Sequence, residues 1–290
     1  MKKDIPVYNI CNIDKSVNPN VLIQRLNEYL KKHYSNLNSP HRHSFYHLVL
    51  FTSGKGTHTI DFETFKIANY QIYFMIPGQV HSWHFENDTD GYIIHFEPEF
   101  FTSFLQKHDY IDQFTFFNGS SKDGVFVIPK NNRKEIHELF ERLLTEINAQ
   151  TDSLDLVRVL LLELFILIEK TSAPNTKHDA QSTSAVMINN FKKLVDKHFR
   201  TYKLPKDYAR LLYITPNHLN AISREVLGKS AGDVIRDRIV LEAKRLLTNA
   251  TMDVSEVAYD LNFQDNSYFT RFFKKYVSIT PDQFRKTIHR

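Results

Sequence analysis

Two short helical hairpins follow one another within Leu204–Arg285, and they constrain the fold more than any other stretch of the chain. The second hairpin begins at Asp253, which forms a capping-box pattern with Glu256. Asn262 breaks its first helix, and Asp265 is the predicted N-cap of its second helix. Both helices carry apolar residues at amphipathic spacing, namely Val254, Val257, Ala258 and Leu261, then Phe269, Phe272, Phe273 and Tyr276. The pattern predicts two amphipathic helices joined by a tight turn.

The first hairpin has the same plan. Pro205 is suited to the first position of one helix, and Thr215 is the predicted N-cap of the next, with Pro216 directly after it. Gly228 ends the second helix. The apolar residues at helical spacing are Tyr208, Leu211 and Leu212, followed by Leu219, Ile222 and Val226.

A long helix predicted over Ser230–Asn249 joins the two hairpins. Ser230 and Asp233 form another capping-box pattern, and the helix has one apolar stripe. A helix of about 20 residues is about 30 Å long, which is close to the ~34 Å turn of B-DNA. We therefore expect the second helices of the two hairpins to enter successive major grooves of one duplex.

The outer faces of these second helices carry amide, hydroxyl and basic side chains, which suit the edges of bases and the phosphates of DNA. The candidates are Asn217, His218, Asn220, Ala221 and Arg224 in the first hairpin, and Asn266, Ser267, Thr270, Arg271, Lys274 and Lys275 in the second. Of these, Arg224, Lys274 and Lys275 are better placed for phosphates. The alternative for each residue is an ordinary solvated helix face.

Several motifs of this region, in this order, resemble the C-terminal DNA-binding domain of the AraC/XylS transcriptional regulators: Glu242–Leu247, Val257–Ala258, Ser267–Lys275 and Thr280–Arg285. Asn262 stands in the turn where the family usually has Gly, and Asn tolerates the left-handed conformation. Ala221 stands where many members have a base-contacting Arg, and Ser223 stands where an aromatic residue is usual. These two departures predict a weaker first hairpin with an unchanged fold.

The length of 290 residues favours two domains, and the composition is that of a soluble globular protein. The single cysteine, Cys11, excludes an intramolecular disulfide and fits a reducing compartment. The N-terminus lacks the apolar core of a signal peptide, so we expect a cytoplasmic protein. From Ile188 onward the chain has 19 Lys and Arg against 11 Asp and Glu, a net charge of +8, whereas the remainder has a net charge of −4. This asymmetry is typical of a protein that binds DNA with one end.

Short strand patterns separated by turn residues occupy residues 41–96, which predicts an antiparallel β-sandwich or barrel. The strands are expected at His47–Thr52, Thr57–Phe62, Gln71–Ile76, Val80–Phe85 and Tyr92–Phe96. Val21–Tyr29 instead has helical spacing of its apolar residues and is predicted to be a short helix.

This block resembles a cupin, and it also matches the sensory domain typical of AraC-type regulators. His41-Arg42-His43 matches the paired histidines of the first cupin motif, and Pro77–His81 approximates the second. Metal-binding cupins carry a carboxylate shortly after the pair, where this chain has His47. His41, His43, His47 and His81 offer imidazoles, but we expect no metal and no other cofactor, because the carboxylate is missing and sensors of this family are usually metal-free.

A closed sheet of this size holds one small ligand, so we expect an effector pocket inside the barrel. The candidate effector-binding residues are His43, Tyr46, His81 and Trp83. The alternative is that these side chains are plain core.

Two helices follow the strands, and the second, Leu154–Ile168, is apolar almost all round. Such a helix must be covered on more than one side, which predicts a homodimer interface that includes Leu160 and Leu164. The alternative is that the helix packs wholly within its own subunit. Residues 171–184 are polar and without apolar periodicity, which predicts a linker.

These patterns predict an α+β chain of two domains. Residues 1–170 form a cupin-like antiparallel β-barrel with flanking helices for effector sensing and dimerisation, residues 171–184 a linker, and residues 185–290 an all-α domain with two helix-turn-helix motifs. We expect a sequence-specific transcriptional regulator that responds to a small-molecule effector and binds promoter DNA. The resemblance implies that it is an activator that contacts RNA polymerase.

No catalytic motif is recognisable, so we predict no catalytic residues and no enzymatic activity. Two alternatives remain open. One is a metal-dependent cupin enzyme with an appended DNA-binding domain, and the other is a regulator without a ligand, whose β domain serves only for dimerisation.

Overall fold

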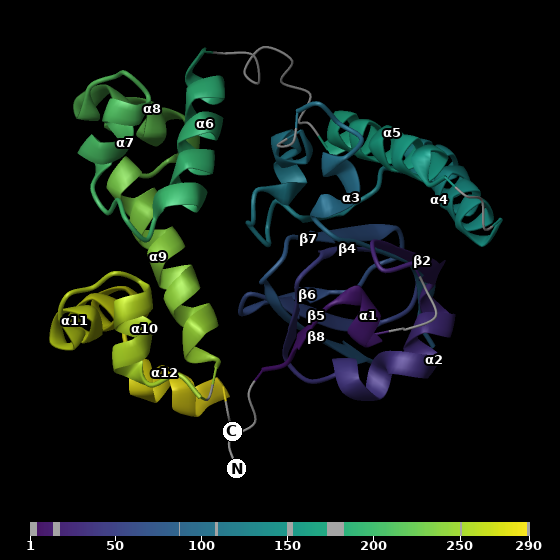
Figure 1. Cartoon of the computed structure of the whole chain (residues 1–290), viewed down its shortest axis with the longest axis horizontal. Helices are drawn as coiled ribbons and strands as arrows, with labels where there is room; N and C mark the ends of the chain where they lie inside the picture. The colour runs from purple at the N-terminus through teal and green to yellow at the C-terminus, as the bar shows by residue number, and fades with distance from the viewer. Residues whose placement is uncertain are drawn as a thin grey trace. The chain divides into compact units, whose positions relative to one another are not determined.

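The computed structural model describes residues 5–13, 18–86, 88–107, 110–149, 153–172, 183–249 and 251–288. The chain divides into two compact units, one within Pro6–Ala173 and the other within Pro174–Arg290 (Figure 1). None of the helices in the described ranges is long and apolar enough to cross a membrane.

The strands of the N-terminal unit form two five-stranded sheets. One sheet has the order β1 (Val7–Tyr8), β3 (His41–His43), β8 (Val80–Phe85), β5 (Gly56–Ile60) and β6 (Glu63–Lys66). The other has the order β10 (Val125–Val127), β7 (Gln71–Met75), β4 (Tyr46–Ser53), β9 (Asp90–Phe96) and β2 (Val21–Arg25). All neighbours are antiparallel except β1 and β3. The predicted antiparallel β domain is confirmed, with its strands arranged as two sheets rather than one closed barrel.

The helix predicted over Val21–Tyr29 is wrong in its first half. Residues Val21–Arg25 form β2 and pair along their whole length with β9, and α2 (Leu26–Leu37) begins only afterwards. The helical spacing arose because buried residues of an edge strand are followed directly by Leu26 and Tyr29, on the buried face of α2.

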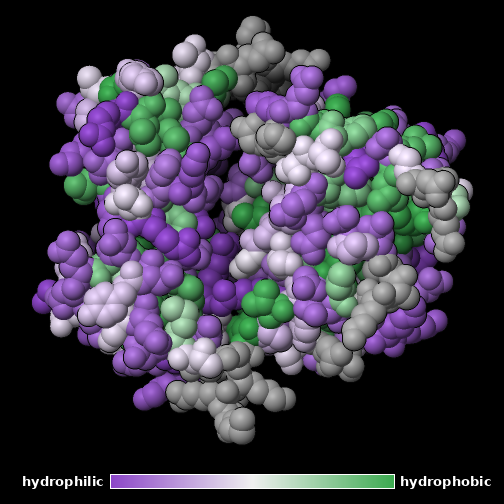
Figure 2. All heavy atoms as spheres, in the orientation of Figure 1, coloured by the Kyte–Doolittle hydropathy of each residue, from purple (hydrophilic) through white to green (hydrophobic). Residues whose placement is uncertain are grey.

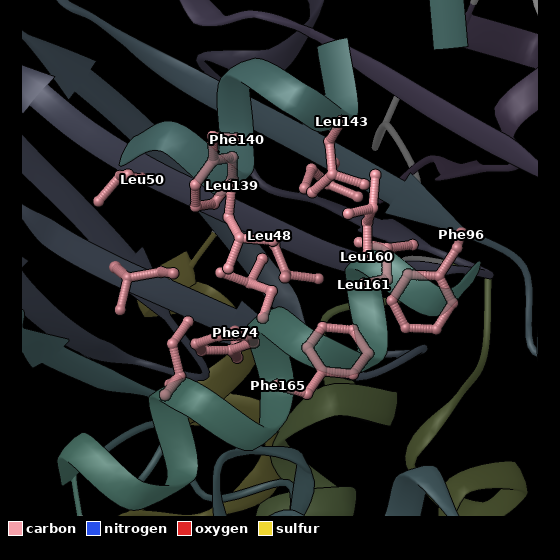
Figure 3. Packing of buried hydrophobic residues seen from close by; sticks show 14 of the residues in the cluster. Leu48, Leu50, Phe74, Phe96, Leu139, Phe140, Leu143, Leu160, Leu161 and Phe165 are labelled. Carbon is pink, nitrogen blue, oxygen red and sulfur yellow. The ribbon is translucent and has the colours of Figure 1, made fainter. Parts of the chain in front are cut away.

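Helices α4 (Arg133–Asn148) and α5 (Asp155–Ser172) pack with the second sheet (Figure 3). Alternate residues of the strands form one apolar core with residues of the two helices: Leu48, Leu50, Phe74 and Phe96 from the sheet, and Leu139, Phe140, Leu143, Leu160, Leu161 and Phe165 from the helices. Leu160 and Leu164 are buried in this core, so their prediction as dimer-interface residues is wrong. The exposed face of α5 instead carries Leu156, Val159 and Ile166.

Short elements complete the unit, namely α1 (Ile10–Ile13), α3 (Glu99–Thr102), η1 (Ile111–Gln113), η2 (Thr115–Phe117) and η3 (Lys130–Asn132). Of the predicted linker, Thr171 and Ser172 belong to α5, and Thr183 and Ser184 belong to the first helix of the next unit. The residues between them lie outside the described part of the chain.

The C-terminal unit is all-helical, as predicted. It contains α6 (Thr183–His198), α7 (Pro205–Leu211), α8 (Pro216–Leu227), α9 (Ala231–Leu247), α10 (Val254–Asp260), α11 (Asn266–Val277) and α12 (Pro281–Ile288). Helix α9 runs between the α7–α8 pair and the α10–α11 pair (Figure 1). The capping boxes at Ser230 and Asp253 are both formed. At 17 residues, α9 is about 26 Å long, which is shorter than predicted.

Candidate DNA interface and effector site

Helices α8 and α11 are held between matching ends. Helix α8 begins at Thr215, whose side chain accepts a hydrogen bond from the His218 amide, and ends at the left-handed Gly228. Helix α11 begins at Asp265, whose carboxylate accepts two backbone N–H groups, and ends at the left-handed Ser278. Both helices have 12 residues, so each position of α8 has a counterpart in α11.

The turn before each helix is also the same. The Ile214 amide donates to the Ala209 carbonyl at 3.0 Å, and the Phe263 amide donates to the Ala258 carbonyl at 2.9 Å. The residue before each of these amides is left-handed, with φ of 55° at both Tyr213 and Asn262. The turn predicted to survive with Asn262 is therefore formed.

Equivalent side chains are presented on the two helices. Asn217, Ala221 and Arg224 on α8 correspond to Ser267, Arg271 and Lys274 on α11, and all six are exposed, as are His218 and Lys275. The spacing of i, i+4 and i+7 places each set along one face of its helix. Each face offers short polar or basic groups of the kind that contact base edges and phosphates.

Three candidates from the sequence are less available. Asn220 and Thr270 are half-buried counterparts, and Asn220 Oδ1 accepts from the Ala231 amide at 3.1 Å. Asn266 is also half-buried, and its Nδ2 donates to Ser255 Oγ at 3.0 Å. The Asn220 and Asn266 amide groups therefore join α8 to α9 and α11 to α10.

An ion-pair network stabilises α9 against its neighbours. Glu242 accepts from Arg238 at 2.9 Å and from Arg200 at 3.0 Å, and Arg200 also donates to Asp260 of α10 at 3.4 Å. Arg238 in turn donates to Asp196 of α6 at 2.8 Å. Burial raises the pKa of Glu242, but the surrounding guanidinium groups lower it by more, so the pKa of Glu242 lies below its usual range. The network joins α6, α9 and α10, and so helps to orient the second hairpin on α9.

In the N-terminal unit, the two sheets enclose buried histidines. His43, His81 and Trp83 lie together, with ring centroids 4.6 Å apart for the two histidines and 5.6 Å apart for His81 and Trp83. Tyr46 lies on the opposite face of its strand, where its ring stacks on Phe96 at 4.8 Å. The structure thus brings together three of the four predicted effector residues and separates Tyr46 from them.

The cluster is larger than the sequence analysis found. Six fully buried histidines come from five strands of both sheets: His41, His43, His47, His58, His81 and His95. Burial lowers the pKa of His41 to about 4 and that of His47 to about 3, and it lowers the pKa of the other four as well. His58 and His95 were missed, although strand alternation places them on the same faces as Ile60 and Ile93.

Surface pockets lie elsewhere on this unit. A pocket of about 560 Å³ is lined by Leu30, Tyr34 and Phe85, and by none of the predicted effector residues. Another, of about 500 Å³, includes Trp83 alone of the four. Side chains that could bind a metal are found in the interior, where one nitrogen from each of His41, His43 and His81 lies within 4.8 Å of the others.

Each of the two units matches a known family of protein domains. Residues 28–165 match the model of the AraC-like ligand binding domain, and residues 208–287 match that of a helix-turn-helix domain. Together the two matches cover more than half of the chain. Among solved structures, fatty-acid-bound ToxT from Vibrio cholerae is 13% identical with a TM-score of 0.43, over 93% of this chain and 96% of that one.

Curated relatives are similar over most of their length. The arabinose operon regulatory protein of Salmonella typhimurium is 24% identical over 83% of each chain. The transcriptional activator RhaR of Mannheimia succiniciproducens is 23% identical over 88% of this chain and 90% of its own. The Msm operon regulatory protein of Streptococcus mutans is 25% identical over 83% of this chain and 84% of its own. The chain therefore belongs to the AraC family of transcriptional regulators, with a ligand-binding domain followed by a helix-turn-helix DNA-binding domain.

Proposed function

We propose that this regulator activates transcription by reading promoter DNA with the exposed faces of α8 and α11. The strongest support is the structural similarity of the two hairpins. Helices α8 and α11 both have a side-chain N-cap and a left-handed C-cap, the same length, and exposed side chains at equivalent positions. RhaR relatives are named as activators, and contact with RNA polymerase is part of the same proposal.

The two hairpins do not contribute equally. Arg271 projects a forked donor that can pair with guanine, whereas its counterpart Ala221 has no hydrogen-bonding group. Arg224 and Lys274 are one turn further along and bind phosphates. Base discrimination is therefore concentrated in α11, while α8 contributes Asn217 and backbone contacts.

Three substitutions test this assignment, using sites selected from fragments of the organism's own DNA. Arg271→Ala should cost about 1–3 kcal/mol at the selected site and relax the preference at one base position. Lys274→Ala should weaken binding to selected and random DNA alike, because a phosphate contact has no sequence preference. Ala221→Arg should add a base preference in the half-site bound by α8.

The result that would reject the assignment is equal loss for Arg271→Ala on selected and random DNA. Arg210, which lies on α7 and is exposed, supplies a matched control with the same charge change. Its replacement by Ala should alter affinity much less than Arg271→Ala and leave the base preference intact.

The N-terminal unit is the effector sensor and the source of dimerisation in this proposal. The interior residues His43, His81 and Trp83 bind the effector. A homodimer forms through the exposed apolar face of α5, and Figure 2 shows hydrophobic residues gathered on the surface around α4 and α5. The proposal includes no catalytic step, and it includes a cytoplasmic location for the protein.

A further inference from the structure

The buried histidines make an unusual set of contacts, in which ring nitrogens face other ring nitrogens. His47 Nδ1 lies 2.9 Å from His95 Nε2, His58 Nε2 lies 2.9 Å from His81 Nδ1, and His81 Nε2 lies 3.5 Å from His43 Nε2. A neutral imidazole has one N–H donor and one lone pair, so each of the two contacts at 2.9 Å requires one ring to donate and the other to accept.

The hydrogen bond of His41 fixes its tautomer. Its Nδ1 lies 2.9 Å from the Ser39 carbonyl, which can only accept, so Nδ1 carries the proton. The lone pair is then on Nε2, which is buried and has no partner among the described residues. A buried acceptor without a partner is costly, which indicates a ligand at this nitrogen.

We propose that His41, His43 and His81 bind one divalent transition-metal ion of the zinc class through their Nε2 atoms. One nitrogen from each residue lies within 4.8 Å of the others. Two nitrogens bound to a tetrahedral zinc at 2.0–2.1 Å lie about 3.3 Å apart, and His43 Nε2 and His81 Nε2 are already 3.5 Å apart. Imidazole is a suitable ligand for zinc, copper, nickel and iron.

The surrounding hydrogen bonds are compatible with a lone pair on Nε2 of His41 and of His81. If His81 donates from Nδ1 to His58 Nε2, the lone pair of His81 is on Nε2, as it is in His41. Hydrogen bonds of this kind orient metal-binding histidines and raise their basicity.

The chemistry of the donor set also specifies the remaining ligand. Within the described part of the chain, this group contains three imidazoles and no carboxylate. A divalent ion bound by neutral ligands alone would keep its full charge in a buried site, which is unfavourable. The fourth tetrahedral position therefore takes an anion, either hydroxide or an acidic group of a small molecule.

The test uses full-length protein without a histidine tag, stripped with a chelator and then dialysed against zinc. Elemental analysis should find one tightly bound ion per chain, and the unfolding midpoint followed by Trp83 fluorescence should rise with free zinc. Cobalt substitution should give the intense visible absorption of a four-coordinate site. No stoichiometric zinc, or a six-coordinate cobalt spectrum, would overturn the proposal.

Variants locate the ion. His43→Gln and His81→Gln should each abolish stoichiometric binding, while His84→Gln, on the exposed face of the same strand as His81, should leave it unchanged. His58→Leu removes the hydrogen-bond partner of His81 while leaving all three ligands in place, and it should weaken zinc affinity about 10- to 100-fold. Equal zinc binding by wild type and His81→Gln would refute the site. If the ligand variants do not fold, the wild-type cobalt spectrum and the His58→Leu affinity decide the question.

The metal site uses His43 and His81, two residues of the proposed effector site, and it is independent of the DNA interface. Failure to bind zinc would leave the roles of Arg271 and Lys274 untouched, and failure of those roles would leave the metal site in place.

Discussion

The turn of the first hairpin stores strain that its counterpart avoids. Tyr213 has φ of 55°, where the Cβ atom of an L-residue approaches the neighbouring backbone. The equivalent residue in the second hairpin is Asn262, which tolerates this conformation. Replacing Tyr213 by Asn should therefore stabilise the C-terminal unit.

The magnitude follows from two observations. The left-handed conformation costs an ordinary residue about 1–2 kcal/mol, and Asn recovers only part of this cost. Tyr213 is 96% exposed, so its replacement removes almost no packing. The expected gain in the free energy of unfolding is about 0.5–1 kcal/mol. For a unit of about 100 residues this corresponds to a rise in Tm of about 2–8 °C.

The assay can separate the two units. Trp83 is the only tryptophan and is buried in the N-terminal unit, so its fluorescence follows that unit alone. Far-ultraviolet circular dichroism also follows the helices of the C-terminal unit. Tyr213→Asn should raise the circular dichroism midpoint and leave the fluorescence midpoint unchanged.

The reciprocal substitution supplies the control. Asn262→Tyr places an aromatic residue at the same φ in the second hairpin, where Asn262 is exposed, and should lower stability by a similar amount. An unchanged or lower midpoint for Tyr213→Asn, together with a neutral Asn262→Tyr, would show that the left-handed conformation is not the source of strain.

Two further results are expected. The double variant Leu156→Asp/Val159→Asp should be a folded monomer by light scattering, and a folded dimer would place the interface elsewhere. Leu160→Asp should instead unfold the N-terminal unit, because Leu160 is 2% exposed and the new charge would be buried unpaired. Since burial lowers the pKa of His41 from 6.5 to about 4, the unfolded chain binds protons that the folded chain does not, and stability of the metal-free protein should fall from pH 6.5 towards 4, by about 3 kcal/mol from this residue alone. Trp83 fluorescence in urea would measure this loss, and a flat profile would contradict it.

The helices of the C-terminal unit could be predicted because their ends depend on local chemistry. The side chains of Thr215, Ser230, Asp253 and Asp265 bond to backbone amides two or three residues away, so sequence alone contains both partners. The end of α8 at Gly228 is also local, because a residue without a Cβ adopts the left-handed conformation readily.

Long-range partners could not be predicted in this way. Asn220 bonds to Ala231, and Asn266 bonds to Ser255, across helices whose packing is set by the whole unit. Their helical positions alone suggested an outward face. The exposed face of α5 had the same difficulty, because Leu156, Val159 and Ile166 are as apolar as the buried residues. Among the exposed residues from Leu156 to Ile166, Glu163 is the one charged residue.

The histidine cluster lies between these cases. Alternation along each strand is local, and it was enough to place His81 and Trp83 on one face. Which strands face each other is not local, and the register that sets His47 opposite His95 depends on the pairing of β4 with β9. Tyr46 was assigned to the effector site by residue type, although its neighbour His47 occupies the inward position of the strand.

The second helices of the two hairpins are held in place by different kinds of contact. In the second, Phe273 packs on Phe284 of α12, with ring centroids 5.6 Å apart, which is a contact with little directional preference. In the first, the equivalent position is Ser223, whose hydroxyl donates to the Lys229 carbonyl at 2.8 Å. Together with the Asn220–Ala231 bond, this fixes α8 on α9 by directional hydrogen bonds. The departure from the family pattern at Ser223 therefore changes how α8 is held. Because Ala221 leaves α8 without a donor at the position of Arg271, the loss predicted for the first hairpin is one of base recognition rather than of structure.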